Sequence, residues 1–141
     1  MSLEWREQLS VGNGAIDGDH KKLIALINAV EVALSTRDWD GFSGALDQLG
    51  TYAQEHFARE EKIARAAGCK NWQRLCQEHE LLGKQLQRAR HELEAMRGEW
   101  VKVTLDHFTV FLRGWLIDHV IKEDLKMKPA LQKFPYDFNP D

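Results

Sequence analysis

Hydrophobic residues recur every three or four positions along most of the chain, and no segment alternates between apolar and polar residues as a strand would. The first such segment follows Asp17, a residue type that suits a helix N-cap. Its inward positions are His20, Leu23, Ile24, Ile27, Val30 and Leu34. A short link at residues 37–40 leads to a second segment, whose inward positions are Phe42, Leu46, Leu49, Ala53, His56, Glu60 and Ile63. We therefore predict two helices in this half of the chain, the second ending near Gly68.

Two further helices are predicted in the second half. One begins at the N-cap Asn71 and ends near Arg97, with inward positions Leu75, His79, Leu82 and Leu86. The other runs from about Glu99 to Met127, with inward positions Val101, Leu105, Phe108, Leu112, Trp115 and His119. All three prolines stand at position 129 or later, so none interrupts a predicted helix.

Short links between four amphipathic helices place consecutive helices side by side and antiparallel. The fold class expected from the sequence is therefore all-α, an antiparallel up-down-up-down four-helix bundle. We expect a single domain over residues 1–141, divided into an extended N-terminal arm (1–16), the bundle (17–127) and a short C-terminal tail (128–141). No internal repeat is evident.

Composition narrows the class of protein. The chain has 141 residues and a net charge of −3, so it has no general electrostatic attraction to nucleic acid or anionic membranes. No apolar stretch is long enough to cross a bilayer, and the acidic, polar start MSLEWREQLS does not resemble a signal peptide. Cys69 and Cys76 form no CxxC pair and are read as reduced thiols. These features favour a cytoplasmic protein, and we expect a monomer.

The inward faces of all four predicted helices carry residue types that are rarely buried together. They are His20, His56, Glu60, His79 and His119, with Asp124 near the end of the fourth helix. At about 1.5 Å rise per residue, all six lie within roughly 16 Å of the same end of an up-down bundle. Burying imidazoles and carboxylates together is costly unless a metal ion pairs with them, so the pattern indicates a metal site. The alternative is a set of buried histidine–carboxylate hydrogen bonds. His91 and His107 fall off the inward faces and are expected at the surface.

Four short motifs carry a resemblance to a known family. They are IDGDHKKL around His20, HFAREE from His56 to Glu61, EHELL at His79 and WLIDHVIKED from Trp115 to Asp124. With these motifs in this order, the chain resembles the hemerythrins, and among them the single-domain bacterial form. The resemblance extends from about Leu3 to Lys126. An up-down bundle is the fold it implies.

The resemblance further implies a non-haem diiron centre that binds O2 reversibly, with an oxo or hydroxo bridge between two Fe ions. In the family one iron is bound by two histidines, which correspond here to His20 and His56. The other iron has three, of which His79 and His119 are present. Glu60 and Asp124 correspond to the bridging carboxylates, and Phe57 and Trp115 would keep the O2 pocket dry.

One position departs from the family pattern. The family has a second histidine four residues before the one that corresponds to His79, and this chain has Leu75 there. Three outcomes are considered. Water fills the vacant place at the second iron, or Cys76 binds in its stead, or the second iron binds weakly enough that one ion or a different metal is found. We favour the first, with lowered affinity for that iron.

The sequence leaves several functions open. The leading prediction is an O2-binding protein for storage, delivery or sensing, rather than an enzyme. An oxidase- or peroxidase-like activity, or binding of NO or peroxide, is the alternative if the missing histidine leaves the site more open. Diiron oxidases and peroxidases generally use more glutamates than the two carboxylates found here, which argues against an enzyme. An iron-handling role is a third alternative.

Overall fold

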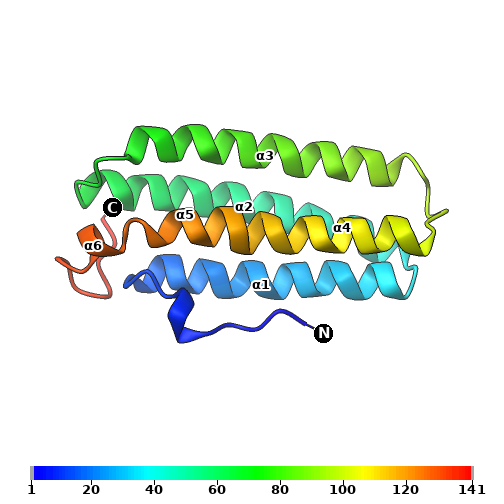
Figure 1. Ribbon diagram of the computed structural model, residues 1–141, viewed down its shortest axis with the longest axis horizontal. Coiled ribbons are helices and arrows are strands. Elements are labelled where there is room, and N and C mark those ends of the chain that lie inside the picture. Colours follow the sequence, from blue (N-terminus) through cyan, green and yellow to red (C-terminus); the bar gives the residue numbers. More distant parts are fainter. Residues whose placement is uncertain (1, 141) are drawn as a thin grey trace.

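The computed structural model describes residues 2–140, which form an all-α protein with four long helical rods side by side (Figure 1). The elements are η1 (Glu7–Leu9), α1 (Gly14–Ser35), α2 (Trp39–Ala66), α3 (Trp72–Glu94), α4 (Lys102–Gly114), η2 (Trp115–Ile121), α5 (Lys122–Leu125) and α6 (Lys128–Leu131). Together α4, η2 and α5 make the fourth rod. The predicted helical bundle is therefore confirmed. Within residues 2–140 no helix is both long and apolar enough to cross a membrane.

The first helix begins four residues earlier than the sequence pattern predicts. Asn13, and not Asp17, is the N-cap of α1, and its side chain accepts a hydrogen bond from the backbone N–H of Ile16. Asp17 instead accepts hydrogen bonds from the hydroxyls of Ser10 and Tyr136 at its Oδ2. An aspartate near a helix start suits either role, and only the fold shows that both chain ends converge on Asp17.

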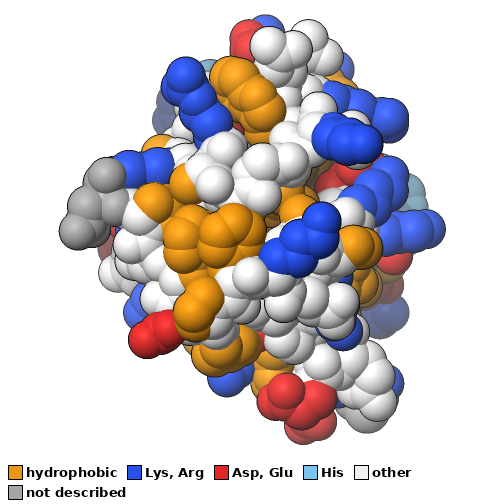
Figure 2. Space-filling view, turned by 90° about the vertical axis from the view of Figure 1, so that its left-hand side faces the viewer, with side chains coloured by type: hydrophobic (Ala, Val, Ile, Leu, Met, Phe, Trp, Pro, Cys, Tyr) orange, Lys and Arg blue, Asp and Glu red, His pale blue; other side chains and the backbone are white. Residues whose placement is uncertain are grey.

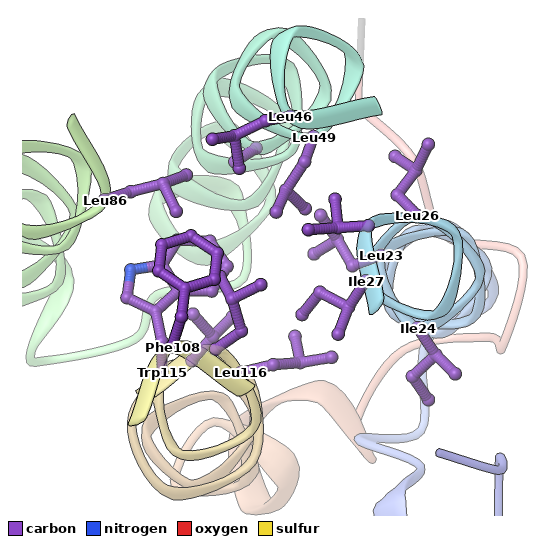
Figure 3. Close-up of a cluster of buried hydrophobic side chains, with 14 of the residues drawn as sticks. Leu23, Ile24, Leu26, Ile27, Leu46, Leu49, Leu86, Phe108, Trp115 and Leu116 are labelled. Atoms are coloured by element: carbon purple, nitrogen blue, oxygen red, sulfur yellow. The ribbon is translucent and has the colours of Figure 1, made fainter. Parts of the chain in front are cut away.

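The inward faces predicted for the first three helices are buried. On α1 the apolar stripe is at most 5% exposed, and the equivalent residues of α2 and α3 are at most 7% exposed. Figure 3 shows Ile27, Leu46 and Leu116 directed into the space between the helices. On the fourth rod the prediction fails at its start, where Val101 is 63% exposed and Trp100 is buried in its place.

A second apolar cluster lies at one end of the bundle, near the α2–α3 connection and α6. It contains Val11, Ile16, Ile63, Ala64, Cys69, Leu75, Met127 and Leu131. Gly68 makes the α2–α3 turn possible with a φ of +73°, a conformation that glycine adopts without strain. The C-terminal tail also packs here, since the Asn13 side-chain amide donates to the backbone carbonyl of Phe138.

The fourth rod changes its winding at the point where the predicted metal ligands stand. Residues 115–121 form a π-helix, in which the hydrogen bonds span five residues in place of four. The buried residues accordingly recur at a spacing of five: Trp115 is followed by Val120, and Leu116 by Ile121. This winding turns His119 outward and lets Asp124, at the start of the next turn, point inward.

Candidate metal centre

Four buried side chains from three helical elements meet inside the bundle. They are His20 from α1, His56 and Glu60 from α2, and Asp124 from α5, and each is 0% exposed. One ligand atom from each lies within 4.8 Å of all the others. His56 and Glu60 are four residues apart, so the α-helix itself brings them to the same face.

The distances within this cluster are short. His20 Nε2 lies 2.7 Å from Asp124 Oδ2. His56 Nε2 lies 2.9 Å from Glu60 Oε2 and 3.5 Å from Asp124 Oδ2. The two histidines and two carboxylates thus pair with one another.

Each residue still has one buried atom that makes no hydrogen bond. His20 Nδ1 and Asp124 Oδ1 have no hydrogen-bond partner. His56 Nε2 and Glu60 Oε2 lie 2.9 Å apart as an ion pair, but neither makes a hydrogen bond. Buried polar groups without partners are costly and rare, and here all four belong to one cluster. A cation bound between them would supply the missing interaction. Two imidazoles and two carboxylates suit iron, manganese or zinc, so the residues fit one such ion.

The charges in the cluster depend strongly on one another. Burial and the nearby Asp124 carboxylate raise the pKa of Glu60. Burial alone would lower the pKa of His56, but the Glu60 carboxylate and hydrogen bonds to Asp124 and Asp19 raise it well above the usual value. Both shifts favour protonated side chains in the cluster, and a bound cation would displace these protons.

Asp19 holds His56 in place from the side away from the cluster. His56 Nδ1 lies 3.0 Å from Asp19 Oδ2, and the Tyr52 hydroxyl donates to Asp19 Oδ1 at 2.6 Å. Arg59 donates from Nε and Nη2 to the same carboxylate at 2.9 and 3.0 Å. Burial alone would raise the pKa of Asp19, but the hydrogen bonds from His56, Arg59 and Tyr52 outweigh it and lower the pKa. A charged Asp19 keeps the proton of His56 on Nδ1, so that Nε2 is free to bind a metal.

His79 touches the cluster through a carboxylate. Its Nε2 lies 3.0 Å from Glu60 Oε1, and its Nδ1 lies 2.7 Å from Glu61 Oε2. The ring stacks on Phe57 with centroids 4.2 Å apart. His79 therefore stands beside the four-residue cluster, on the far side of Glu60 from His56.

The remaining predicted ligand, His119, is not brought into the cluster. Its side chain is exposed and borders a groove of about 700 Å³ between α3 and α4. Its expected inward position assumed α-helical winding, which the π-helix replaces. His91 and His107 are exposed, as expected.

Leu75 is 7% exposed and packs in the second apolar cluster. Leu75 is apolar, and the side chain of His119 points away from the cluster. Among the described residues, the donors left for the second ion of a diiron centre are therefore His79 and the two carboxylates that both ions would share. The donors thus fit one ion fully and a second ion only in part.

Sequence reasoning missed the residues around the cluster. Asp19, Arg59 and Glu61 all stand inside the motifs that carried the resemblance, each directly beside or within three residues of a predicted ligand. A carboxylate at such a position is also common on exposed helix faces, so the spacing alone gives no signal. Tyr52, one turn before His56, is likewise recognisable only from its contact with Asp19.

Comparison with known proteins agrees with the geometry. The family described as "Hemerythrin HHE cation binding domain" matches residues 11–131. The chain is 28% identical over 125 residues to a bacteriohemerythrin of Stenotrophomonas maltophilia, and the aligned region covers 86% of this chain and 76% of that protein. Over 129 residues it is 28% identical to a hemerythrin-like protein of Naegleria gruberi, covering 92% and 93% of the two chains. The matched region includes all four residues of the buried cluster, and the chain belongs to the hemerythrin family.

Proposed function

We propose that this protein binds O2 reversibly at a non-haem diiron centre, for O2 storage, delivery or sensing. The observation that carries the proposal is the cluster of four buried metal-binding side chains, each with an unsatisfied atom, in a chain of the hemerythrin family. Hemerythrins bind O2 and are not enzymes. Iron supplies the redox chemistry when bound, and the protein supplies the donors and a dry surrounding.

The proposed ligands are His20, His56, Glu60, His79, His119 and Asp124. His20 and His56 would bind the first ion, and the carboxylates of Glu60 and Asp124 would be shared by both ions; these four residues meet in the buried cluster. Two aromatic side chains exclude water on the side of His79. Phe57 stacks on the imidazole, and Trp115 is 1% exposed and donates from Nε1 to the carbonyl of Leu82 at 3.0 Å. His119 has to turn inward from the α3–α4 groove to reach the second ion.

We further propose that the second ion is held more weakly than the first, with water in the place of the missing histidine. Leu75 offers no donor, and losing a direct ligand costs at least the ten- to hundredfold in affinity typical of losing an outer contact. Cys76 is a poor substitute. Burial and a hydrogen bond to Glu61 raise the pKa of its thiol to about 11, whereas a metal requires the thiolate.

Metal titration of the iron-free protein with Fe(II) under anaerobic conditions tests this proposal. We expect one tight equivalent and a second that binds at least about tenfold more weakly. The substitution Leu75→His should tighten the second equivalent. Leu81→His, on the exposed face of the same helix, is the matched control and should not. Saturation at a single equivalent would exclude the diiron centre, and an unchanged second equivalent in Leu75→His would refute our account of that position.

The open second position also favours an alternative, an oxidase- or peroxidase-like turnover. Exposing the reduced, iron-loaded protein to air separates the two functions. Reversible binding predicts a visible absorption that depends on O2 and disappears when O2 is removed. Immediate irreversible oxidation, with consumption of added reductant over many cycles, would instead support the enzyme.

A further inference from the structure

A separate pocket opens at the end of the bundle that carries the α2–α3 turn and α6. It has a volume of about 320 Å³. Apolar side chains from three parts of the chain line it: Ala64, Cys69, Trp72, Leu75, Met127, Pro129 and Ala130. Figure 2 shows this end of the molecule, where hydrophobic side chains gather in the middle with Lys and Arg side chains beside them. The size is at the lower end of the range for small-molecule sites.

The border of this pocket is strongly basic. Its lining includes four exposed basic residues, Lys70, Arg74, Lys126 and Lys133, and Glu123 is the one acidic residue among the described residues that line it. Glu123 forms an ion pair with Lys126 at 2.9 Å, so it neutralises the charge of Lys126 and leaves the other three basic residues unaffected. Three cations therefore remain around an apolar interior, although the chain as a whole carries a net charge of −3. This local reversal of charge attracts an anion to the pocket.

We propose that this pocket binds a small organic anion, with an apolar body of about ten heavy atoms and one carboxylate. The apolar part would lie on Trp72, Leu75 and Met127, where burial of its surface supplies most of the affinity. The carboxylate would face the basic border and pair with Lys and Arg side chains. An inorganic anion could not bury apolar surface on Trp72, Leu75 and Met127. A neutral apolar molecule could not pair with the basic border.

The pocket lies beside the metal-binding cluster and contains none of its ligands. None of His20, His56, Glu60 and Asp124 lines it, whereas Leu75, which stands at the place of the missing histidine, is part of its lining. The proposed site goes beyond O2 binding and does not depend on it. Binding of the anion can therefore be measured whether or not the iron proposal holds.

Calorimetric titration with 4-phenylbutyrate tests the proposal, and 4-phenylbutanamide is the neutral control of the same shape. We expect saturable binding of one equivalent of the acid and at least about tenfold weaker binding of the amide, since charge-assisted pairing is lost. Equal affinity for the two would overturn the role of the basic border. Absence of saturable acid binding up to about 10 mM would overturn the site.

Two variants locate the binding. Ala130→Phe places a large side chain in the pocket and should abolish binding, while the metal content and the helical circular dichroism stay unchanged. Arg74→Gln combined with Lys133→Gln alters only exposed side chains and should weaken binding of the acid several-fold. The double control Lys84→Gln with Lys102→Gln removes the same charge elsewhere and should have little effect. Retained binding in Ala130→Phe, or equal losses in the two double variants, would place the anion elsewhere.

Discussion

Asp19 shows how one residue can set the properties of the buried cluster from outside it. Its carboxylate accepts hydrogen bonds from Tyr52 and Arg59 and lies 3.0 Å from Nδ1 of His56. These contacts join α1 to two successive turns of α2. Because Asp19 stays charged, it fixes both the orientation and the protonated nitrogen of His56.

Replacement of this carboxylate tests its role. Asp19→Asn should lower the affinity for the first metal ion about ten- to hundredfold, since the amide no longer holds His56 with the same strength. Competition with a chelator of known affinity measures the change. Asp106→Asn, an exposed carboxylate on α4, serves as the control and should leave the affinity unaltered. If the affinity for the first metal ion is the same in Asp19→Asn as in the wild-type protein, Asp19 does not hold His56 for metal binding.

Helix α1 shows how strongly the burial of a side chain depends on the face of the helix that carries it. Ile27 is 0% exposed and Val32, on the same helix, is 62% exposed. Truncating a buried aliphatic residue removes its transfer free energy and leaves a cavity.

We expect Ile27→Ala to lower the free energy of unfolding by about 2–5 kcal/mol. Val32→Ala should change it by less than about 0.5 kcal/mol. Urea denaturation followed by circular dichroism measures both. Similar values for the two variants would show that the face of α1 assigned to the core is wrong.

The C-terminal tail is an element held partly by a titratable contact. The Tyr136 hydroxyl donates to Asp17 at 2.9 Å, and the backbone carbonyl of Tyr136 accepts from Gly14 at 2.7 Å. Burial and the hydrogen bond to Asp17 raise the pKa of Tyr136. A raised pKa means that the neutral phenol stabilises the fold. This contribution is complete below the ordinary tyrosine pKa of about 10 and is lost as the pH rises through the higher pKa of the folded state.

Near neutral pH, the free energy of unfolding of the wild-type protein should therefore be higher than that of Tyr136→Phe by up to about 1 kcal/mol. The difference should disappear above the raised pKa of Tyr136. Denaturation of both proteins at a series of alkaline pH values measures it, and comparison of the two removes the titration of other groups. A difference that grows with pH would have the wrong sign for this contact.

In the bundle as a whole, the buried cluster links three of the four rods. His20, His56, Glu60 and Asp124 come from α1, α2 and α5, and each contributes a buried atom that makes no hydrogen bond. An ion that binds only the folded state satisfies these atoms and raises the free energy of unfolding through its affinity.

At a free metal concentration a hundred times the dissociation constant, the gain should be about 2.7 kcal/mol. Thermal unfolding with saturating metal and with excess chelator measures the difference. Glu60→Gln should abolish most of this shift, because it removes a charged donor. A melting temperature that is the same with metal and with chelator would show that the cluster binds no ion.

Local spacing along the chain is enough to predict the helical architecture and most of the residues in the buried cluster. A period near 3.6 specifies one inward face for each regular helix, so His20, His56, Glu60 and His79 were placed correctly inside the bundle from spacing alone. Asp124 falls off the inward face of a regular α-helix, and it was included because it stands near the end of its helix. Local spacing suffices for these residues because a regular helix repeats the same geometry.

The remaining features depend on the winding of the fourth rod and on how the helices pack. The π-helical winding of residues 115–121 turns His119 to the surface and brings Asp124 inward, and no simple residue pattern announces such a change of winding. The bonds of Asp19 span up to 40 residues. The basic pocket at the bundle end joins residues 64–75 to residues 123–133. Contacts between distant segments depend on how the helices pack, and packing is a property of the assembled bundle that no single helix encodes.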